Sequence, residues 1–277
     1  MQLSNNMKIS IIIPAYKQEK TILKDIENIS NVMSHTRWDY EIICVVDGFL
    51  DKTFENASKT VDKKIKVVGY EVNKGKGYAV RYGMARSEGE YVAFIDAGMD
   101  INPNGISLLL EHMIWYDADV IVGSKRHSAS KVVYPFVRKI YSFFYQMLVR
   151  ILFGLKIKDT QVGLKIFKRK VLQKVLPRLI VKRYAFDIEI LAVSRYLGFD
   201  KIYDAPVEIN FDFTNTNFNP AKLIFNKNIW LMLIDTIAVF YRMRFMNFYD
   251  DNSKRLWVYD KDLEMRINTG ELGNNEV

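Results

Sequence analysis

Cysteine is almost absent from this 277-residue sequence, which contains only Cys44. A disulfide within the chain is therefore impossible, and this cysteine usage is typical of proteins in a reducing cytoplasm. Cys44 lies inside the apolar run of residues 42–46, where a cysteine usually behaves as a small hydrophobic core residue. We therefore interpret Cys44 as a packing residue.

Histidine and long apolar runs are also scarce. The three histidines show no spacing typical of zinc ligands. The first apolar run, residues 9–13, is too short for the hydrophobic region of a signal peptide. The longest run, residues 229–241, is interrupted by Asp235, whereas a spanning helix needs ~20 mostly apolar residues. We expect no zinc site, no signal peptide and no spanning helix, and hence a cytoplasmic protein.

Acidic residues are nearly missing from one part of the chain. The whole sequence has 40 Lys and Arg against 32 Asp and Glu, a net charge of +8. Residues 125–182, however, contain fifteen Lys and Arg and one acid, Asp159, so this segment has a charge of +14 and the remainder −6. Such asymmetry predicts an anionic partner, for which lipid headgroups and phosphate substrates both qualify. We expect no nucleic acid, because the segment has no nucleic-acid-binding motif.

The first half of the chain alternates short apolar runs with helical patterns. The composition, 49% hydrophobic and 26% charged, is that of a folded protein. Runs rich in Ile and Val predict strands at residues 8–14, 40–47, 65–71, 90–96 and 118–124. Helical spacing predicts helices at residues 19–33, 51–60, 76–86 and 103–115. This alternation predicts an α/β fold, a mostly parallel sheet with helices on both faces.

Two amphipathic segments distinguish the second half. In residues 132–155 and 221–245, aromatic and aliphatic residues recur at helical spacing, and Lys or Arg residues lie among them or near their ends. Both segments could be helices that lie on a membrane surface with their apolar faces inward, or they could be core helices of the same domain. Residues 268–277 are expected to form a loose polar tail.

Three of the predicted strands deliver polar residues to one edge of the sheet. These residues, with their near neighbours, are Pro14, Ala15, Tyr16, Glu19, Asp47, Asp96 and Asp100. Open α/β sheets bind ligands at this carboxyl edge. Asp96 and Asp100 suit a divalent metal that holds phosphates, although a strand end before a capped helix looks the same. Since Tyr16 could also stack on a nucleotide base, the layout indicates a nucleotide-sugar site.

Residues 73–77, Asn-Lys-Gly-Lys-Gly, follow a predicted strand and open a predicted helix. Glycine amides and lysines at a helix N-terminus form a natural phosphate cradle, which makes Lys76 a candidate phosphate ligand. No G-K-[ST] ends the segment, and Val80 stands where a dinucleotide fingerprint needs glycine. The segment therefore argues against a P-loop NTPase and against an NAD enzyme.

An ordered set of motifs from residue 8 to about residue 215 resembles family 2 glycosyltransferases of the GT-A fold. Residues 14–22 match P-x-Y-N-E-x-x-x-I, residues 45–53 match V-D-D-G-S-x-D-x-T, residues 73–77 match N-x-G-K-G, residues 96–98 match D-x-D and residues 123–126 match G-S-R. Residues 159–167 match D-T-Q-x-G-F-K-x-F, and residues 184–190 match W-A-F-D-x-E-L. The late motifs are most similar to those of dolichyl- and polyprenyl-phosphate sugar transferases, of the β-glucosyl and mannosyl types.

The resemblance implies a GT-A, Rossmann-like fold that binds a UDP- or GDP-linked sugar, with Mg²⁺ or Mn²⁺ held on the diphosphate by the D-x-D carboxylates. It implies nucleotide-sugar contacts from Pro14, Ala15, Tyr16, Glu19, Asp47, Lys76 and Asp96. Arg126 (or Lys125) and Arg138 would receive the phosphate of a polyprenyl acceptor, which accounts for the basic segment at an anionic membrane surface. Asp159, Gln161, Asp187 and Glu189 would line the junction of donor and acceptor, as catalytic residues with Asp96.

The chemistry implied by the resemblance needs no strong general base. A lipid monophosphate has a second pKa near ~6 and is a nucleophile at neutral pH. The protein would align its oxygen with the anomeric carbon and stabilise the leaving diphosphate. Direct displacement inverts the anomeric centre. The expected function is therefore an inverting transfer of sugar to polyprenyl phosphate at the cytoplasmic face of a membrane, with peripheral attachment.

The departures from the family pattern that matter most for the site lie in two motifs. Val46 and Phe49 replace the first Asp and the Ser of V-D-D-G-S, and Gly98 replaces the second Asp of D-x-D. Asp100 is the candidate substitute. Two alternatives stay open. One is a family 2 glycosyltransferase with a soluble glycan acceptor, and the other, motivated by Val46 and Gly98, is a non-catalytic membrane-associated relative.

The expected domain organisation follows the motifs and the amphipathic segments. We expect residues 1–215 to form the GT-A domain, including the basic segment 131–155. Residues 216–248 would form a membrane-surface helix, and residues 249–277 a polar C-terminal tail. The sequence indicates no oligomeric state.

Overall fold

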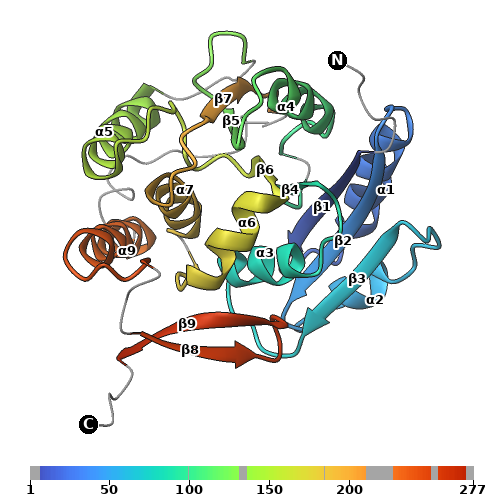
Figure 1. Ribbon diagram of the computed structural model, residues 1–277. Coiled ribbons are helices and arrows are strands. Elements are labelled where there is room, and N and C mark those ends of the chain that lie inside the picture. Colours follow the sequence, from blue (N-terminus) through green and yellow to red (C-terminus); the bar gives the residue numbers. More distant parts are fainter. Residues whose placement is uncertain are drawn as a thin grey trace.

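A seven-stranded sheet lies at the centre of the part of the chain that the computed structural model describes (Figure 1). The described residues are 7–98, 100–130, 136–183, 185–209, 227–250 and 255–272. The strand order is β3-β2-β1-β4-β6-β5-β7. The strand bounds are β1 Lys8–Ala15, β2 Asp39–Asp47, β3 Ile65–Tyr70, β4 Tyr91–Ile95, β5 Val120–Ser124, β6 Leu164–Lys168 and β7 Ile202–Pro206.

Helices cover both faces of this sheet. Their bounds are α1 Ile22–Ser34, α2 Thr53–Ala57, α3 Lys76–Ala85, α4 Asn104–Trp115, α5 Phe136–Phe153, α6 Arg169–Val175, the 3₁₀ helix η1 Leu176–Arg178, α7 Phe186–Tyr196 and α9 Lys227–Arg244. Residues of β1 alternate between the two faces, as strand geometry requires. Ile12 packs in the core shared with α3 and α7, whereas Ile11 and Ile13 pack in the core shared with α1 and α4.

The pairing is parallel over most of the sheet. β1 is parallel to both β2 and β4, β3 is parallel to β2, and β7 is parallel to β5. Among the described strands of this sheet, β6 alone is antiparallel to its neighbours, β4 and β5. The prediction of a mostly parallel α/β sheet is therefore confirmed. The strand prediction misses β6, because the lysines of Leu-Lys-Ile-Phe-Lys interrupt its apolar pattern.

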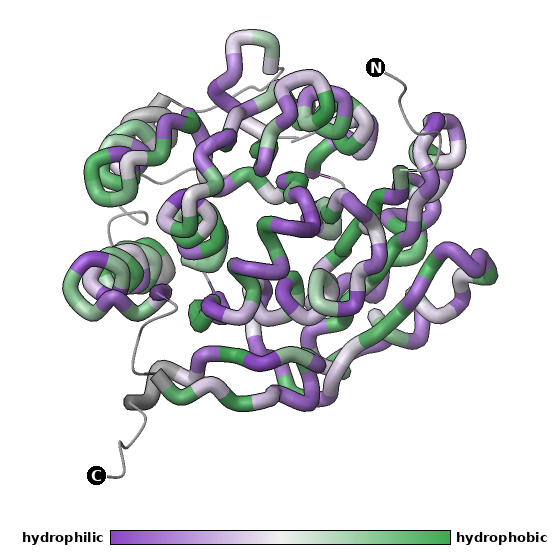
Figure 2. Tube along the Cα trace, viewed as in Figure 1, coloured by the Kyte–Doolittle hydropathy of each residue, from purple (hydrophilic) through white to green (hydrophobic). Residues whose placement is uncertain are grey.

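The two amphipathic segments form α5 and α9, which lie side by side at one end of the molecule (Figure 1). The Tyr145 hydroxyl and Thr236 Oγ1 are 2.9 Å apart, and the rings of Phe153 and Phe240 pack edge to face. Figure 2 shows hydrophobic and hydrophilic residues alternating along both helices. In the described part of the chain, no helix combines the length and apolar character needed to cross a membrane.

Both helices expose apolar side chains. The exposed members on α5 are Phe143, Phe144, Met147 and Ile151, and those on α9 are Trp230, Ile234, Ile237 and Tyr241. Other residues of the same helices, such as Val149 and Val239, are buried in the core. The two interpretations of these segments are therefore compatible, because one face of each helix is core and another is exposed and apolar.

A β-hairpin follows α9 where a polar tail is expected. Its strands are β8 Arg255–Asp260 and β9 Met265–Leu272, and the Asn268 side chain donates to the Phe248 carbonyl at 3.0 Å. At the turn, Asp262 pairs with Lys74 at 2.9 Å. The expectation of a loose tail is thus wrong for residues 268–272, because cross-strand pairing and these contacts order polar residues. Residues 273–277 lie outside the described residues, and the division into domains stays a prediction.

Candidate functional site

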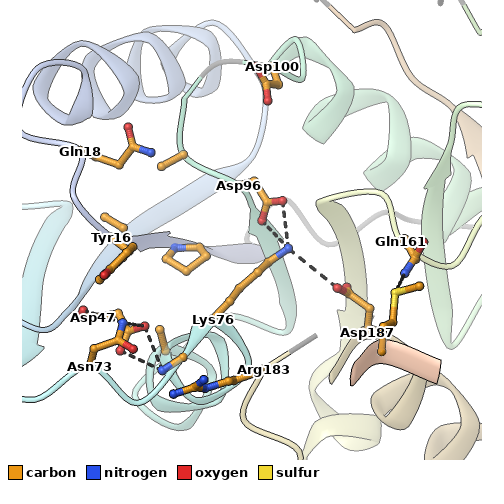
Figure 3. A pocket seen from close by; sticks show the side chains of 16 residues that line it. Tyr16, Gln18, Asp47, Asn73, Lys76, Asp96, Asp100, Gln161, Arg183 and Asp187 are labelled. Carbon is orange, nitrogen blue, oxygen red and sulfur yellow. Dashed lines mark hydrogen bonds and ion pairs between the residues drawn. The ribbon is translucent and has the colours of Figure 1, made fainter. Parts of the chain in front are cut away.

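A cavity of about 730 Å³ lies at the carboxyl ends of β1, β2 and β4 (Figure 3). This is the sheet edge at which the sequence predicts a ligand site. Predicted residues at the cavity are Pro14, Ala15, Tyr16, Asp47, Lys76, Asp96, Asp100, Gln161 and Asp187. The larger of the lining side chains that were not predicted are Gln18, Asn73, Arg183 and Met232. The tertiary structure therefore brings the early and late motifs together around one volume.

Asp47 organises the loop that precedes α3. Its carboxylate accepts hydrogen bonds from the Tyr70 hydroxyl at 2.9 Å, from the Asn73 amide at 2.7 Å and from the backbone N–H groups of Lys74 and Gly75 at 2.7 and 3.0 Å. Carboxylates bound to several donors hold them firmly, since each such bond is charge-assisted. Asp47 is almost fully buried, so it acts here on the protein's own backbone.

The glycines of this loop allow a close approach of the chain before α7. Gly75 has a φ of +99°, and a Cβ there would lie 2.5 Å from the Lys182 carbonyl oxygen. A Cβ at Gly77 would lie 2.6 Å from the Phe186 Cβ. The Tyr78 N–H donates to the Lys182 carbonyl at 3.3 Å. These contacts bring Arg183 to the cavity, so the glycines have a packing role in addition to any phosphate contact.

Four alternating charges run from the cavity into the core. Lys76 Nζ lies 2.8 and 2.9 Å from the two Asp96 oxygens and 3.8 Å from Asp187 Oδ2 (Figure 3). The other Asp187 oxygen pairs with Lys165, whose side chain is fully buried. Lys165 also donates to the Val162 carbonyl at 2.7 Å. The row Asp96–Lys76–Asp187–Lys165 therefore balances two carboxylates against two ammonium groups.

The charges in this row keep one another ionised. Burial by itself disfavours the Lys76 ammonium, but Asp96 and Asp187 outweigh it and raise the pKa of Lys76. Burial also raises the pKa of Asp187, but Lys165 and Lys76 outweigh it and lower that pKa. Both groups are therefore charged at neutral pH, and the cavity contains a fixed pattern of charge.

Asp96 and Asp100 are the candidate metal ligands. Among the described residues, no group makes a hydrogen bond to the buried Asp96 Oδ1, and the Lys76 ammonium lies 2.8 Å from it. Burial and the repulsion from Asp96 raise the pKa of Asp100. A cation next to both carboxylates would relieve that repulsion, so the two residues fit a divalent ion that takes its other ligands from phosphates and water. The described residues contain no preformed cluster of three or more His, Cys, Asp or Glu for a metal.

Gly98 and Gly163 shape the Asp96 loop. Gly98 has a φ of +103°, and its N–H donates to Asp25 Oδ2 at 2.8 Å. Asp25 is a buried carboxylate on α1 that the sequence does not predict. A Cβ at Gly163 would collide with the Asp96 carboxylate, and the Asp96 N–H donates to the Gly163 carbonyl at 2.9 Å. The glycine of the late D-T-Q-x-G motif is therefore required by the approach of Asp96.

Other predicted site residues do not line the cavity. Glu189 is fully buried and accepts from the N–H groups of Ile180 and Val181 and from the Tyr249 hydroxyl. It therefore supports the segment that leads to Arg183. The buried Asp159 accepts from the Gln161 N–H at 3.1 Å.

The remaining predicted residues are Glu19, just before α1, and the two arginines proposed for the acceptor phosphate. Glu19 is exposed, and its side chain accepts from the Lys52 N–H at 3.3 Å. Arg126 follows the end of β5, and its N–H donates to Ser124 Oγ at 3.3 Å. The Arg138 side chain lies outside the described residues, although its backbone belongs to α5. The roles of these three residues stay predictions.

The sequence contains signals for four of the missed residues. Arg183 directly precedes residues 184–190, and Lys165 lies inside residues 159–167, so one adjoins and the other belongs to a motif already singled out. Gln18 and Asn73 are equally inside matched segments. Met232 lies on α9 and contacts the Gln161 side chain, a contact between distant segments for which the sequence has no signal.

Comparison with known proteins finds a matching family and similar sequences. The model of the family described as Glycosyl transferase family 2 matches residues 10–176. A dolichyl-phosphate beta-glucosyltransferase from Dictyostelium discoideum is 29% identical over 234 residues, which cover 79% of this chain and 69% of that protein. The protein of the same description from Homo sapiens is 30% identical over 238 residues, which cover 80% and 71%.

A solved structure shares the fold. Glucosyl-3-phosphoglycerate synthase from Mycobacterium tuberculosis, crystallised with Mn²⁺, UDP and phosphoglyceric acid, has a TM-score of 0.61 and 19% identity, and the match covers 95% of this chain and 86% of that one. At this identity the likeness concerns the fold alone. It confirms the expectation of a Rossmann-like, GT-A architecture.

Proposed function

We propose a sugar transfer as the function, since this chain belongs to glycosyl transferase family 2. In this proposal the protein transfers glucose from UDP-glucose to a polyprenyl phosphate such as dolichyl phosphate. The donor sugar and the acceptor are those in the names of its relatives, and UDP is bound in the solved structure of similar fold. The single observation that supports the proposal most is the cavity in which Asp96, Lys76, Asp187 and Arg183 converge.

The cavity has the charge pattern that a nucleotide diphosphate needs. Lys76 and Arg183 supply cations to the cavity, and Asp96 and Asp100 supply carboxylates. Bound Mg²⁺ or Mn²⁺ would be held by these two carboxylates and would neutralise the leaving diphosphate. Tyr16, whose side chain is half exposed at the cavity, offers an aromatic face for the base.

The protein's remaining task is to place the acceptor phosphate opposite the sugar. Asp187 and Gln161 line the cavity on the side of α7 and α9, and we assign them to the junction of donor and acceptor. The ionised Asp187 can accept from a sugar hydroxyl and so orient the anomeric carbon. Arg126 and Arg138 remain our candidates for the acceptor phosphate. Displacement by a phosphate oxygen that is already ionised would invert the anomeric centre.

The exposed apolar faces of α5 and α9 suit a membrane-bound acceptor. Met232 of α9 lines the cavity and contacts Gln161, so the helix with the exposed Trp230 and Ile234 also forms part of the cavity wall. Helices of this kind bind in the interfacial region of a bilayer. We infer peripheral attachment through these faces, on the cytoplasmic side, which would bring the lipid phosphate to the cavity.

Transfer is tested with purified protein, UDP-glucose or GDP-mannose, Mn²⁺ or Mg²⁺, and a short polyprenyl phosphate. We expect a glucosylated lipid from UDP-glucose, detected by mass spectrometry, and its loss in Asp96→Asn. Asp262→Asn, on the C-terminal hairpin, is the matched carboxylate control. Absence of a lipid-linked product with every donor would refute the proposal, and transfer to phosphoglyceric acid or a soluble glycan instead would identify a soluble acceptor.

Membrane attachment is tested separately by sedimentation with anionic liposomes. Burying an Ile side chain contributes about 1.5–3 kcal/mol, so Ile234→Asp should weaken binding by about tenfold or more. Val61→Asp is the matched control, because Val61 is 95% exposed but lies outside both helices. Equal sedimentation of wild type and Ile234→Asp would contradict attachment through α9.

A further inference from the structure

The Lys76 ammonium occupies the part of the cavity in which a metal ion bound to Asp96 would lie. Its ammonium lies within 2.9 Å of both Asp96 oxygens. The two side chains are 37% and 38% exposed, so the pair faces the cavity and is not sealed in the core. The Asp96–Lys76 contact is therefore open to any ligand that enters.

This ammonium competes with a second cation for the same carboxylate. Asp96 Oδ1 accepts no hydrogen bond from the described residues and has the Lys76 ammonium as its contact. Like charges that share one carboxylate repel each other, and the repulsion is strong where the site is only partly solvated. The nucleotide-free protein should therefore bind a divalent ion weakly.

The Lys76 side chain has room to change partner. It projects from the first residue of α3 on a flexible four-carbon chain, and its alternative carboxylate, Asp187 Oδ2, already lies at 3.8 Å. Lys165, by contrast, is fully buried and paired with the other Asp187 oxygen. Of the two lysines in the charge row, Lys76 is thus the one that faces the cavity and has a second carboxylate within reach.

We propose, building on the function proposed above, that Lys76 is an internal counter-ion of Asp96 that makes divalent-metal binding depend on the nucleotide diphosphate. In the nucleotide-free protein Lys76 neutralises Asp96. When a diphosphate enters, Lys76 turns toward its oxygens and leaves Asp96 free to act as a metal ligand. The nucleotide then raises the affinity for metal, and by thermodynamic reciprocity the metal raises the affinity for nucleotide.

The proposal predicts the behaviour of Lys76→Met without any turnover measurement. Mn²⁺ binding is measured by electron paramagnetic resonance and calorimetry, with and without UDP. Without UDP, Lys76→Met should bind Mn²⁺ about tenfold or more tighter than wild type, within the usual range of coupling between sites. Without metal, the variant should bind UDP more weakly. The Mn²⁺ dissociation constant without UDP, divided by the one with UDP, should therefore be smaller for Lys76→Met than for wild type.

Three further variants separate charge from shape. Lys76→Arg keeps the charge and should retain the weak Mn²⁺ binding of nucleotide-free wild type, whereas Lys76→Gln should behave like Lys76→Met. Lys64→Met removes a lysine from a surface pair with Asp39 at 3.0 Å and should change nothing. Thermal melting checks that each variant is folded.

The outcomes distinguish this proposal from the proposed function. If wild type binds Mn²⁺ with UDP but Lys76→Met and Lys76→Gln gain no Mn²⁺ affinity without UDP, the counter-ion role is refuted and the proposed function stands. If neither wild type nor variant binds Mn²⁺ in the presence of UDP, both proposals fail. Equal Mn²⁺ affinity of wild type with and without UDP would also overturn the counter-ion role.

Discussion

Removing the buried Lys165 ammonium should strongly destabilise the protein. Lys165 is fully buried, and its ammonium pairs with Asp187, which is itself 8% exposed. Lys165→Met conserves the shape of the side chain but leaves the Asp187 carboxylate without its nearest partner. Breaking a buried ion pair in this way typically costs about 3–5 kcal/mol. Lys76 remains 3.8 Å from Asp187, so we expect a value near the lower end of that range.

Urea and thermal unfolding measure this cost. For a chain of this size each kcal/mol corresponds to roughly 2–4 °C in Tm, so a loss of about 3 kcal/mol should lower Tm by roughly 6–12 °C. Lys165→Met combined with Asp187→Leu removes both charges and should recover much of the stability. The reasoning is refuted if Lys165→Met costs less than about 1 kcal/mol, or if the double variant is as unstable as the two single changes added together.

The same pair makes stability depend on pH. The pKa of Asp187 is lowered in the folded protein, because Lys165 and Lys76 outweigh the effect of burial. A lowered carboxyl pKa stabilises the fold above the unfolded pKa of about 3.9, and this stabilisation is lost as the pH falls toward the folded pKa. Urea unfolding between about pH 5 and pH 3 should therefore show a larger loss of stability in wild type than in the double variant, in which the other carboxyl groups still titrate.

Three further outcomes follow from the cavity. Gly163→Ala should displace the Asp96 carboxylate and weaken Mn²⁺–UDP binding about tenfold or more in calorimetry; unchanged affinity would mean that the loop adjusts freely. Burial raises the pKa of Asp25, so the ionised carboxylate costs stability at neutral pH and less in acid. Asp25→Asn keeps an acceptor for the Gly98 N–H and should therefore stabilise the protein more at pH 7 than at pH 4 in urea unfolding. Chelation by EDTA should abolish sugar transfer, and Mn²⁺ should restore it; transfer that persists would exclude a metal requirement.

The fold was largely predictable from local patterns. The five predicted strands of the first half all form, because Ile- and Val-rich runs bury both faces of a parallel sheet. β6 was not predictable in this way. Its Lys165 is a core residue only because Asp187, 22 residues further on, lies opposite it. The β8–β9 hairpin was missed for a related reason, since polar residues form strands there through contacts with distant segments such as the one that contains Lys74.

The candidate site was predictable as a set of residues but not as an arrangement. Nine of the predicted residues line the cavity. Those of the first half follow from strand ends and a helix N-terminus that share one edge of the sheet, whereas Gln161 and Asp187 were predicted from the resemblance to the family. Glu189 and Asp159 were in the same motifs, yet both are buried and accept hydrogen bonds from backbone N–H groups of nearby segments. A carboxylate within a motif can act on a ligand or on the backbone, and only the direction of its side chain decides between them.

The sequence by itself determined the five strands of the first half, their carboxyl edge and the residue types collected there, since these depend on periodicities within a few residues. Only the tertiary structure decided which side chains contact one another. It placed Lys76 on Asp96, required glycine at Gly75 and Gly163 because distant chain segments approach them, and brought Arg183 and Met232 to the cavity. These contacts join residues far apart in the chain, and their energies depend on distances and burial that exist only after the chain has folded.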